Sequence, residues 1–314
     1  MGTPTVTGMG TDMGTTTLKS EMWPFSKKTT ISQSGILRGA TDHHSHILPG
    51  VDDGVESMDE ALRILATYEA AGVKELWLTP HIMEDIPNTP EKLLTHFAEL
   101  QAAYTGSITL HLAAEYMIDN HLRSLLSELT EGNNTNNNCP SFKRGTSNTG
   151  NIAQEVQDNN NSPSSKREYP QGEGVEKKSI AEGIALLTIG KKHNHLLVET
   201  SYYNPPMRLH ETLRQIKSLG YHPLLAHPER YMYMDKEEYI RLHQEGVKFQ
   251  LNLPSICGGY GNTVKKRALW LLNEGLYDVI GSDTHCEEGM EYLLAARIKE
   301  KELVNLSQIQ SLIL

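Results

Sequence analysis

Histidines and acidic residues gather in five separate places along the 314-residue sequence. These places are Asp42-His43-His44-Ser45-His46 with Asp52-Asp53-Gly54 after it, His81, Glu115, His227-Pro228-Glu229-Arg230, and Asp283-Thr284-His285. Imidazole nitrogens combined with carboxylate oxygens suit Zn, Fe or Mn, whereas Mg and Ca favour oxygen ligands alone. The residue types therefore point to binding of divalent transition metals.

The number of candidate ligands exceeds what one tetrahedral zinc ion needs. The candidates are His44, His46, Asp53, His81, Glu115, His227, Asp283 and His285. A cluster of two or three ions bridged by carboxylates is the economical interpretation. Ions about 3.5–4 Å apart can stabilise both the attacking and the leaving oxygen of an in-line displacement. The pattern predicts hydrolysis of a phosphate ester.

Each motif also has an ordinary structural explanation when it is taken alone. A His-x-His pair can be solvated, Asp52-Asp53-Gly54 can be a turn, and Asp283 can cap a helix. The metal interpretation rests on all the motifs occurring together at the ends of predicted strands. In an extended segment His44 and His46 point to one side and His43 to the other, so we expect His43 not to be a ligand.

The elements that must position these residues alternate between strands and helices. Short apolar runs predict buried parallel strands at residues 39–42, 73–79, 108–113, 195–199, 222–226, 247–252 and 278–281. Ser57-Met58-Asp59-Glu60 predicts a capping box, Thr89-Pro90 a helix start, and Gly72, Gly220, Gly246 and Gly275 helix ends. Seven such units favour a barrel, in which the carboxyl ends of the strands converge on one face.

The expected domain organisation is a disordered segment at residues 1–35 followed by a single barrel domain at 36–314. An Asn-rich insertion at about 132–178 interrupts this domain, and its composition predicts disorder. The first residues lack a signal-peptide pattern, which predicts a cytoplasmic protein. Met22 is a second plausible start beside Met1.

Composition and motif searches exclude several function classes. The 29 basic against 39 acidic residues give a net charge of −10, which argues against nucleic-acid binding, and no apolar run predicts membrane insertion. The three cysteines are odd in number and scattered, so a reducing compartment without a disulfide framework is expected. No arginine stands six positions after Cys139, Cys257 or Cys286, as a cysteine-based phosphatase would need. A Gly-x-Ser-x-Gly elbow and a Walker loop are also absent from the sequence.

The segment from Asp42 to Gly54 resembles the opening motif of the PHP (polymerase and histidinol phosphatase) superfamily. More narrowly, the chain resembles the capsular and exopolysaccharide branch of metal-dependent protein-tyrosine phosphatases. The supporting motifs are Thr79-Pro80-His81, Ala114-Glu115-Tyr116, Val198-Glu199-Thr200-Ser201-Tyr202, Ala226-His227-Pro228-Glu229-Arg230-Tyr231, Gln250-Leu251-Asn252 and Ser282-Asp283-Thr284-His285. The resemblance covers about residues 22–300, apart from the insertion.

This resemblance implies a distorted (β/α)7 barrel of the PHP type that holds three metal ions. His44, His46, Glu115 and Asp283 would hold one ion, and His81, Glu115 and His227 a second. Asp53 and His285 would complete a third and take part in catalysis. Manganese is the first expectation, with Zn, Fe or Mg as the other candidates.

The implied reaction is hydrolysis of phosphotyrosine by a metal-bound hydroxide, which attacks phosphorus directly. Arg230 is expected to clamp the phosphate through its planar fork. The implied substrate and partner is a phosphotyrosyl protein, namely the Tyr-rich tail of a bacterial tyrosine kinase that controls polysaccharide export. The sequence makes no prediction about the oligomeric state.

One departure from the family pattern concerns a second arginine, which relatives often carry shortly after the Asp-x-His motif. Here Cys286-Glu287-Glu288-Gly289-Met290 follows, so Arg297, Arg208 or Lys265 would have to replace it. Three alternatives stay open. They are a phosphatase for histidinol phosphate or another small phosphomonoester, a metal-dependent phosphodiesterase or exonuclease, and a non-catalytic metal-binding regulator of the kinase.

Overall fold

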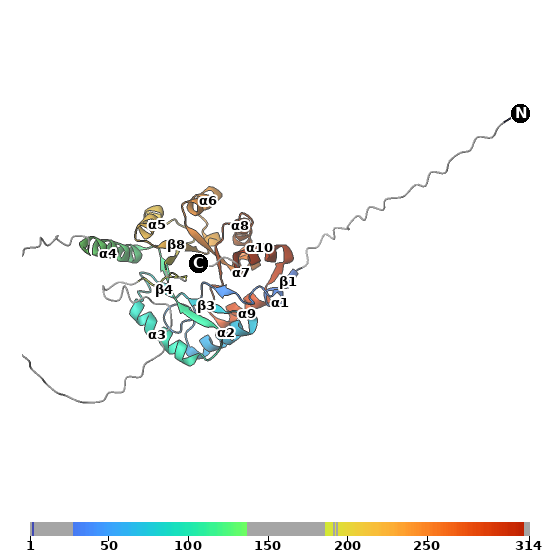
Figure 1. Ribbon diagram of the computed structural model, residues 1–314, viewed down its shortest axis with the longest axis horizontal. Coiled ribbons are helices and arrows are strands. Elements are labelled where there is room, and N and C mark those ends of the chain that lie inside the picture. Colours follow the sequence, from blue (N-terminus) through green and yellow to red (C-terminus); the bar gives the residue numbers. More distant parts are fainter. Residues whose placement is uncertain (1, 3–27, 137–185, 191, 193, 311–314) are drawn as a thin grey trace, which may run out of the picture.

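Parallel strands alternate with helices through most of the chain (Figure 1). The computed structural model describes residues 2, 28–136, 186–190, 192 and 194–310. The strands are β1 (Lys28–Thr30), β2 (Thr41–Asp42), β3 (Glu75–Leu78), β4 (His81–Ile82), β5 (Thr109–Leu112), β6 (Glu115–Met117), β7 (His195–Glu199), β8 (His222–Ala226), β9 (Lys248–Asn252), β10 (Val279–Gly281) and β11 (Arg297–Lys299). Each of the seven predicted strands is present, β7 and β8 with the predicted bounds.

Helices surround the strands in Figure 1. They are α1 (Ile31–Ser34), α2 (Met58–Ala71), α3 (Pro90–Ala103), α4 (Asn120–Asn136), α5 (Leu209–Ser218), α6 (Lys236–Gln244), α7 (Leu253–Cys257), α8 (Gly261–Asn273), α9 (Glu287–Ala295) and α10 (Glu300–Gln310). A short 3₁₀ helix, η2 (Pro228–Arg230), follows β8. Within the described ranges, no helix combines the length and the apolar composition needed to cross a bilayer.

Two parallel sheets carry all the described strands except β1 and β11. One has the order β10-β9-β8-β7-β6-β4 and the other the order β2-β3-β5, and all neighbours in both are parallel. Only two residues separate β3 from β4 and β5 from β6. The His43 N–H donates to the Ile280 carbonyl (3.0 Å) and the Asp283 N–H to the His44 carbonyl (2.8 Å), which joins the exits of β2 and β10. The predicted α/β fold with parallel strands is confirmed.

The strands bury side chains on both of their faces. Leu196, Val198 and Leu225 belong to the large apolar cluster that includes side chains of the helices, whereas Leu197 and Leu224 belong to a smaller cluster. All five are fully buried. Such burial on both faces explains why these strands read as continuous apolar runs in the sequence.

Most of the predicted helix boundaries are confirmed. The Ser57 hydroxyl accepts from the Glu60 N–H (3.3 Å), and the Thr89 hydroxyl from the Lys92 N–H (3.3 Å). The four predicted glycines, namely Gly72, Gly220, Gly246 and Gly275, all have left-handed backbone conformations. The second half of the predicted capping box is not formed, because the Glu60 carboxylate accepts from the Glu287 N–H of α9 instead (3.3 Å).

Both segments predicted to be disordered include residues that the structure shows in helices or strands. Residues 28–34 form β1 and α1, with Ile31 fully buried, and β1 pairs antiparallel with β11 near the other end of the chain. Residues 132–136, expected in the insertion, belong to α4. The rest of the predicted segments, residues 1, 3–27 and 137–178, lies outside the described residues, as does Cys139.

Candidate metal centre

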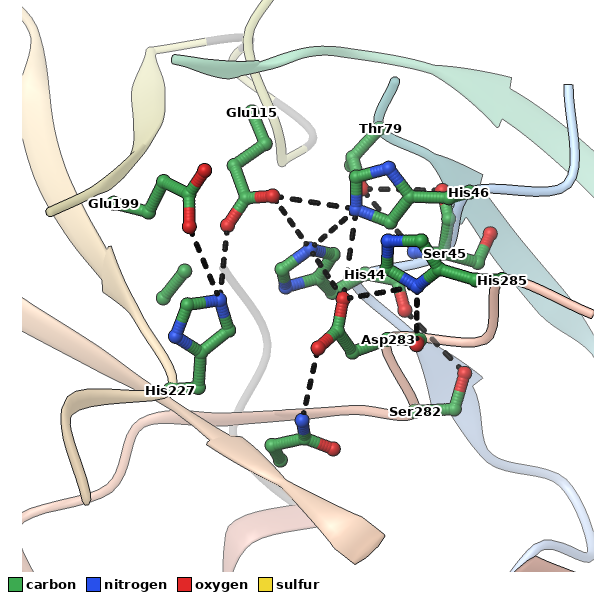
Figure 2. Close-up of polar contacts among 12 residues, drawn as sticks. His44, Ser45, His46, Thr79, Glu115, Glu199, His227, Ser282, Asp283 and His285 are labelled. Carbon is green, nitrogen blue, oxygen red and sulfur yellow. Dashed lines mark hydrogen bonds and ion pairs between the residues drawn. The ribbon is translucent and has the colours of Figure 1, made fainter. Parts of the chain in front are cut away.

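Four buried side chains from three distant parts of the chain point toward one another (Figure 2). The Nε2 atoms of His44 and His46, two residues apart, lie 3.0 Å from each other. Oε2 of Glu115 lies 3.1 Å and 3.2 Å from these two nitrogens. Oδ1 of Asp283 lies 3.4 Å and 3.5 Å from them. The predicted convergence of these residues is therefore present.

Glu115 also joins this group to two further histidines. Its Oε2 lies 3.3 Å from Nδ1 of His81, and its Oε1 lies 3.2 Å from Nε2 of His227. Glu199, at the end of β7, completes the arrangement at 3.4 Å from His81 Nδ1 and 3.7 Å from His227 Nε2. Glu115 thus lies at the centre, where its two oxygens can bridge neighbouring ions.

Asp53 and His285 lie at the more exposed side of the cluster. Asp53 Oδ1 is 3.5 Å from His81 Nε2 and 3.7 Å from His285 Nε2, and the Asp53 side chain is 64% exposed. The His285 ring stacks on His46 with a centroid separation of 4.1 Å. All eight predicted ligands therefore lie within one continuous cluster.

Three overlapping groups within the cluster have donor atoms close enough to share an ion. They are His46, Asp53, His81 and His285; His44, Glu115, His227 and Asp283; and His81, Glu115 and Glu199. The groups divide the residues differently from the predicted sets, because His46 falls with His81 and His227 falls with His44. His43 belongs to none of them, and its Nδ1 bonds the Ile280 carbonyl at 3.2 Å.

Glycines and strained backbone allow this close packing. A Cβ atom on Gly281 would lie 2.5 Å from the Cβ of His44, and one on Gly54 would lie 2.0 Å from the carbonyl oxygen of His46. His227 and Asp283 have φ angles of 32° and 55°, which are unfavourable for residues with a side chain. Such strain is typical of functional sites, where the surrounding structure holds it in place.

Two buried side chains fix the proton positions of His44 and His46. The amide oxygen of Gln250 accepts from Nδ1–H of His44 (2.9 Å), and the Asp52 carboxylate accepts from Nδ1–H of His46 (2.8 Å). In the neutral form of both rings Nδ1 therefore carries the proton, and both Nε2 atoms can offer lone pairs to a cation. Partners of this kind orient histidines that ligate metals.

These lone pairs and carboxylates fit divalent cations. Metal–ligand bonds of about 2.0–2.2 Å place neighbouring donor atoms about 3.0–3.5 Å apart, which matches the separations around His44 and His46. Although burial opposes it, Glu115 and Asp283 raise the pKa of His44, and Asp52 and Glu115 raise the pKa of His46 well above its usual range. Protons on these nitrogens would hold the cluster together without a metal, and a cation would take their place. Nδ1 of His81, Nδ1 of His227 and Oε2 of Glu115 also have no hydrogen-bond partner among the described residues.

The charge balance of the cluster supports the same fit. Burial lowers the pKa of His81 and of His227 to about 4, so both rings are neutral at pH 7 and able to ligate. Burial and the nearby Glu115 and Asp283 carboxylates raise the pKa of Glu199 well above its usual range. Cations would remove this cost by favouring the ionised carboxylate.

Arg230 lies against the cluster between two aromatic rings. Its Nη1 donates to Oδ2 of Asp283 and its Nη2 to the hydroxyl of Tyr202, both at 2.6 Å. The guanidinium carbon is 4.4 Å from the ring centroid of Tyr202 and 4.3 Å from that of Tyr260. Asn252 also donates to Asp283 Oδ2 (3.0 Å). Asp283 thus uses one oxygen for the cluster and the other for Arg230 and Asn252.

The sequence model of the family described as "Capsular polysaccharide synthesis, CpsB/CapC" matches residues 40–138 and 165–297. The chain belongs to this CpsB/CapC family. Every residue of the cluster lies inside the matched ranges.

Relatives within the CpsB/CapC family include named phosphatases. The chain is 24% identical over 265 residues to the putative tyrosine-protein phosphatase CapC of Staphylococcus aureus, and the match covers 83% of each chain. It is 25% identical over 252 residues to the tyrosine-protein phosphatase CpsB of Streptococcus pneumoniae, covering 78% of this chain and 82% of that one. The fold also matches a solved structure from work on YwqE of Bacillus subtilis and CpsB of Streptococcus pneumoniae, which are described as "unique metal-dependent tyrosine phosphatases". The match covers 85% of each chain, with a TM-score of 0.58 and 16% identity. This likeness supports the fold.

Sequence reasoning assigned no role to several residues of the site. Glu199 stands at the carboxyl end of a correctly predicted strand, and this position was the signal that could have identified it. Asp52, Gln250 and Asn252 act through other side chains, which no local pattern indicates. The sequence analysis assigned the other histidines no metal role, and the described ones lie outside the three groups. They are His96, His111, His121, His195, His210, His222 and His243; His193 lies outside the described residues.

The candidates for the missing second arginine make other contacts. Arg208 pairs with Glu211 at 3.6 Å, Lys265 donates to the Cys257 carbonyl at 3.4 Å, and Arg297 lies in β11. No recorded contact among the described residues links any of the three to the cluster. Glu287 pairs with Arg63 of α2 at 2.9 Å.

Proposed function

We propose that this chain is a metal-dependent protein-tyrosine phosphatase. The observation that carries the proposal is the cluster of buried lone pairs and carboxylates around Glu115, in a chain that belongs to the CpsB/CapC family. Phosphotyrosyl proteins are the substrate class, as the names of the relatives imply. The Tyr-rich tail of a bacterial tyrosine kinase of polysaccharide export is the specific substrate that we propose.

The proposed ligands are the eight predicted residues together with Glu199. Their number and spacing support three ions, with Glu115 as the bridging carboxylate. Mn²⁺ is our proposal for the physiological ion, and the mixed imidazole and carboxylate donors also suit Zn²⁺ or Fe²⁺. When bound, the ions would supply an activated water at neutral pH and would neutralise phosphoryl oxygens.

The protein's own side chains hold and orient the reacting groups. Asp52 and Gln250 keep the Nε2 lone pairs of His46 and His44 directed into the cluster. Arg230 has N–H groups beyond the two that bond Asp283 and Tyr202, and these can hold a phosphoryl oxygen. Asp53 and His285, at the exposed side, are placed to meet the incoming phosphate.

We further propose that the strands form a distorted (β/α)7 barrel in a single domain, which includes β1 and α1 and so begins before the predicted residue 36. Support comes from the backbone hydrogen bonds between the exits of β2 and β10, which bring the first and last of the seven predicted strands together. The parallel bridge between Ser45 and Thr284 continues this contact. In such a barrel the site lies at the carboxyl ends of the strands.

An assay on several substrates tests the proposed function. Protein supplied with Mn²⁺ is expected to hydrolyse a phosphotyrosyl peptide faster than histidinol phosphate or a phosphodiester, and chelator is expected to stop the reaction. Asp283→Ala and His46→Ala are expected to abolish the activity, whereas His96→Ala on α3 serves as the matched histidine control.

The other outcomes of this assay correspond to the alternative functions. Preference for histidinol phosphate or for the phosphodiester would replace the tyrosine phosphatase proposal. Hydrolysis of none of the substrates by metal-loaded protein would favour the non-catalytic regulator, for which the missing second arginine is the supporting observation. The cytoplasmic location stays a prediction, and cell fractionation tests it.

A further inference from the structure

The Tyr202 side chain lies beside the cluster at the end of the β7 segment. Its ring meets the ring of His227 edge-on at a centroid separation of 5.9 Å and stacks against Arg230. Arg230 connects this hydroxyl to Asp283, because one terminal nitrogen of the planar guanidinium donates to Asp283 and the other donates to Tyr202. The hydroxyl is therefore held in a fixed place next to the proposed metal site.

The hydrogen bond to Arg230 leaves the Tyr202 proton free. An arginine N–H can only donate, so the Tyr202 oxygen is the acceptor at 2.6 Å. No hydrogen bond recorded among the described residues takes up the phenolic proton. The ring is partly buried against the core, which limits the directions in which the O–H group can point.

The free proton meets a chemical need of the site. Residues 286–296, which follow the Asp-Thr-His motif, contain no arginine that could contact the phosphate. A phosphoryl group at the cluster brings several acceptor oxygens, and Arg230 provides one cationic donor for them. A second donor beside Arg230 would bond an oxygen that Arg230 alone leaves without a donor.

We propose that the Tyr202 hydroxyl donates a hydrogen bond to the phosphoryl group of the substrate. Arg230 and Tyr202 then act as a paired donor site, with the Arg230 N–H groups and the Tyr202 O–H directed at neighbouring phosphoryl oxygens. Tyr260, 40% exposed, closes the other face of the guanidinium. This inference rests on the proposed phosphatase function.

The test compares Tyr202→Phe with Tyr203→Phe in protein loaded with Mn²⁺. Tyr203→Phe is the matched control, because Tyr203 is the next residue, is 76% exposed and makes no side-chain hydrogen bond to a described residue. Binding of inorganic phosphate is measured by calorimetry, alongside the metal content per chain and the unfolding temperature. We expect Tyr202→Phe to weaken phosphate binding about tenfold, since hydrogen bonds to charged groups are worth this much. Metal content and unfolding temperature should stay at wild-type values.

A second comparison separates direct contact from an effect through Arg230. The same substitution is made in an Arg230→Ala background, and phosphate binding is measured again. Direct contact predicts that Tyr202→Phe still weakens binding there. A loss that vanishes without Arg230, or phosphate binding by Tyr202→Phe equal to that of Tyr203→Phe, would overturn the proposal.

These measurements are independent of turnover. If wild-type protein binds phosphate but does not hydrolyse a phosphotyrosyl peptide, the proposed function fails and the Tyr202 contact is still decided by phosphate affinity.

Discussion

Gly281→Ala tests whether the tight packing beneath His44 is needed to build the metal site. Gly281 is the last residue of β10 and is fully enclosed. An added Cβ would lie 2.5 Å from the Cβ of His44 and 2.6 Å from Nε2 of Gln250. Ordinary carbon contacts need about 3.5 Å or more, so both side chains must move away from Gly281 by about 1 Å.

The size of the effect follows from what these two side chains do. A displacement of about 1 Å in a site residue costs on the order of 100-fold in activity, and loss of an orienting partner costs about 10–100-fold in metal affinity. Overpacking of this kind also costs about 1–3 kcal/mol of unfolding free energy. We therefore expect metal affinity to fall at least tenfold in Gly281→Ala, with a moderate loss of stability.

Metal titration by calorimetry and urea unfolding of metal-free protein measure the two effects separately. Gly289→Ala is the matched control, because a Cβ there lies 3.6 Å from the Cys286 sulfur, and alanine favours the helix α9. It should bind metal normally and be no less stable than wild type. Normal metal affinity in Gly281→Ala would refute the view that His44 and Gln250 are held in place by this packing.

Three further predictions concern the orienting residues and the pH response. Asp52→Asn should lower metal affinity about 10–100-fold in a titration, because His46 loses the carboxylate that fixes its Nδ1 proton; unchanged affinity would contradict this role. Arg230→Lys should lower kcat/KM for a phosphotyrosyl peptide at least tenfold in steady-state kinetics, since an ammonium has no planar fork that can stack between two rings and keep N–H groups for phosphate beside Asp283 and Tyr202; a wild-type kcat/KM would contradict this role of the guanidinium. Burial and the nearby His222 lower the pKa of His195 from 6.5 to about 4, so the unfolded chain takes up the proton first as the pH falls. The stability from this residue is complete above pH 6.5 and is lost toward pH 4. From pH 7 to pH 4.5 the free energy of unfolding in urea should fall by about 1–2 kcal/mol less in His195→Gln than in wild type, after allowance for partial exposure. An identical fall in the two proteins would exclude His195 as the cause.

The strands β7, β8 and β9 could be predicted from the sequence because they are buried on both faces. Leu196, Leu197 and Val198 are all fully buried, so β7 appears as a continuous apolar run with clear ends. The pairing of β1 with β11 could not be predicted, because it joins residues almost 270 positions apart and neither strand has a distinctive pattern. The short strands β4 and β6 were not predicted either, because they begin just beyond the predicted strands at residues 73–79 and 108–113.

The ligand cluster was predictable because parallel strands bring their carboxyl ends together. His44, His81, Glu115, His227 and Asp283 were therefore expected to meet, and the structure places them together. The orienting roles of Asp52 and Gln250 were not predictable, although both residues stand in motifs of the sequence, because their partners become known only in space. The contact of Glu60 was not predictable either, because its carboxylate accepts from the Glu287 N–H of α9, far along the chain, and not from the start of its own helix.

The most direct test of the account measures metal content and phosphotyrosine hydrolysis on one sample. Elemental analysis of purified protein supplied with Mn²⁺ should give at least two ions per chain, and the same sample should hydrolyse a phosphotyrosyl peptide until the ions are chelated. Re-addition of Mn²⁺ should restore both values together. Full activity in protein stripped of metal, or a chain that retains no divalent ion, would contradict the central claim.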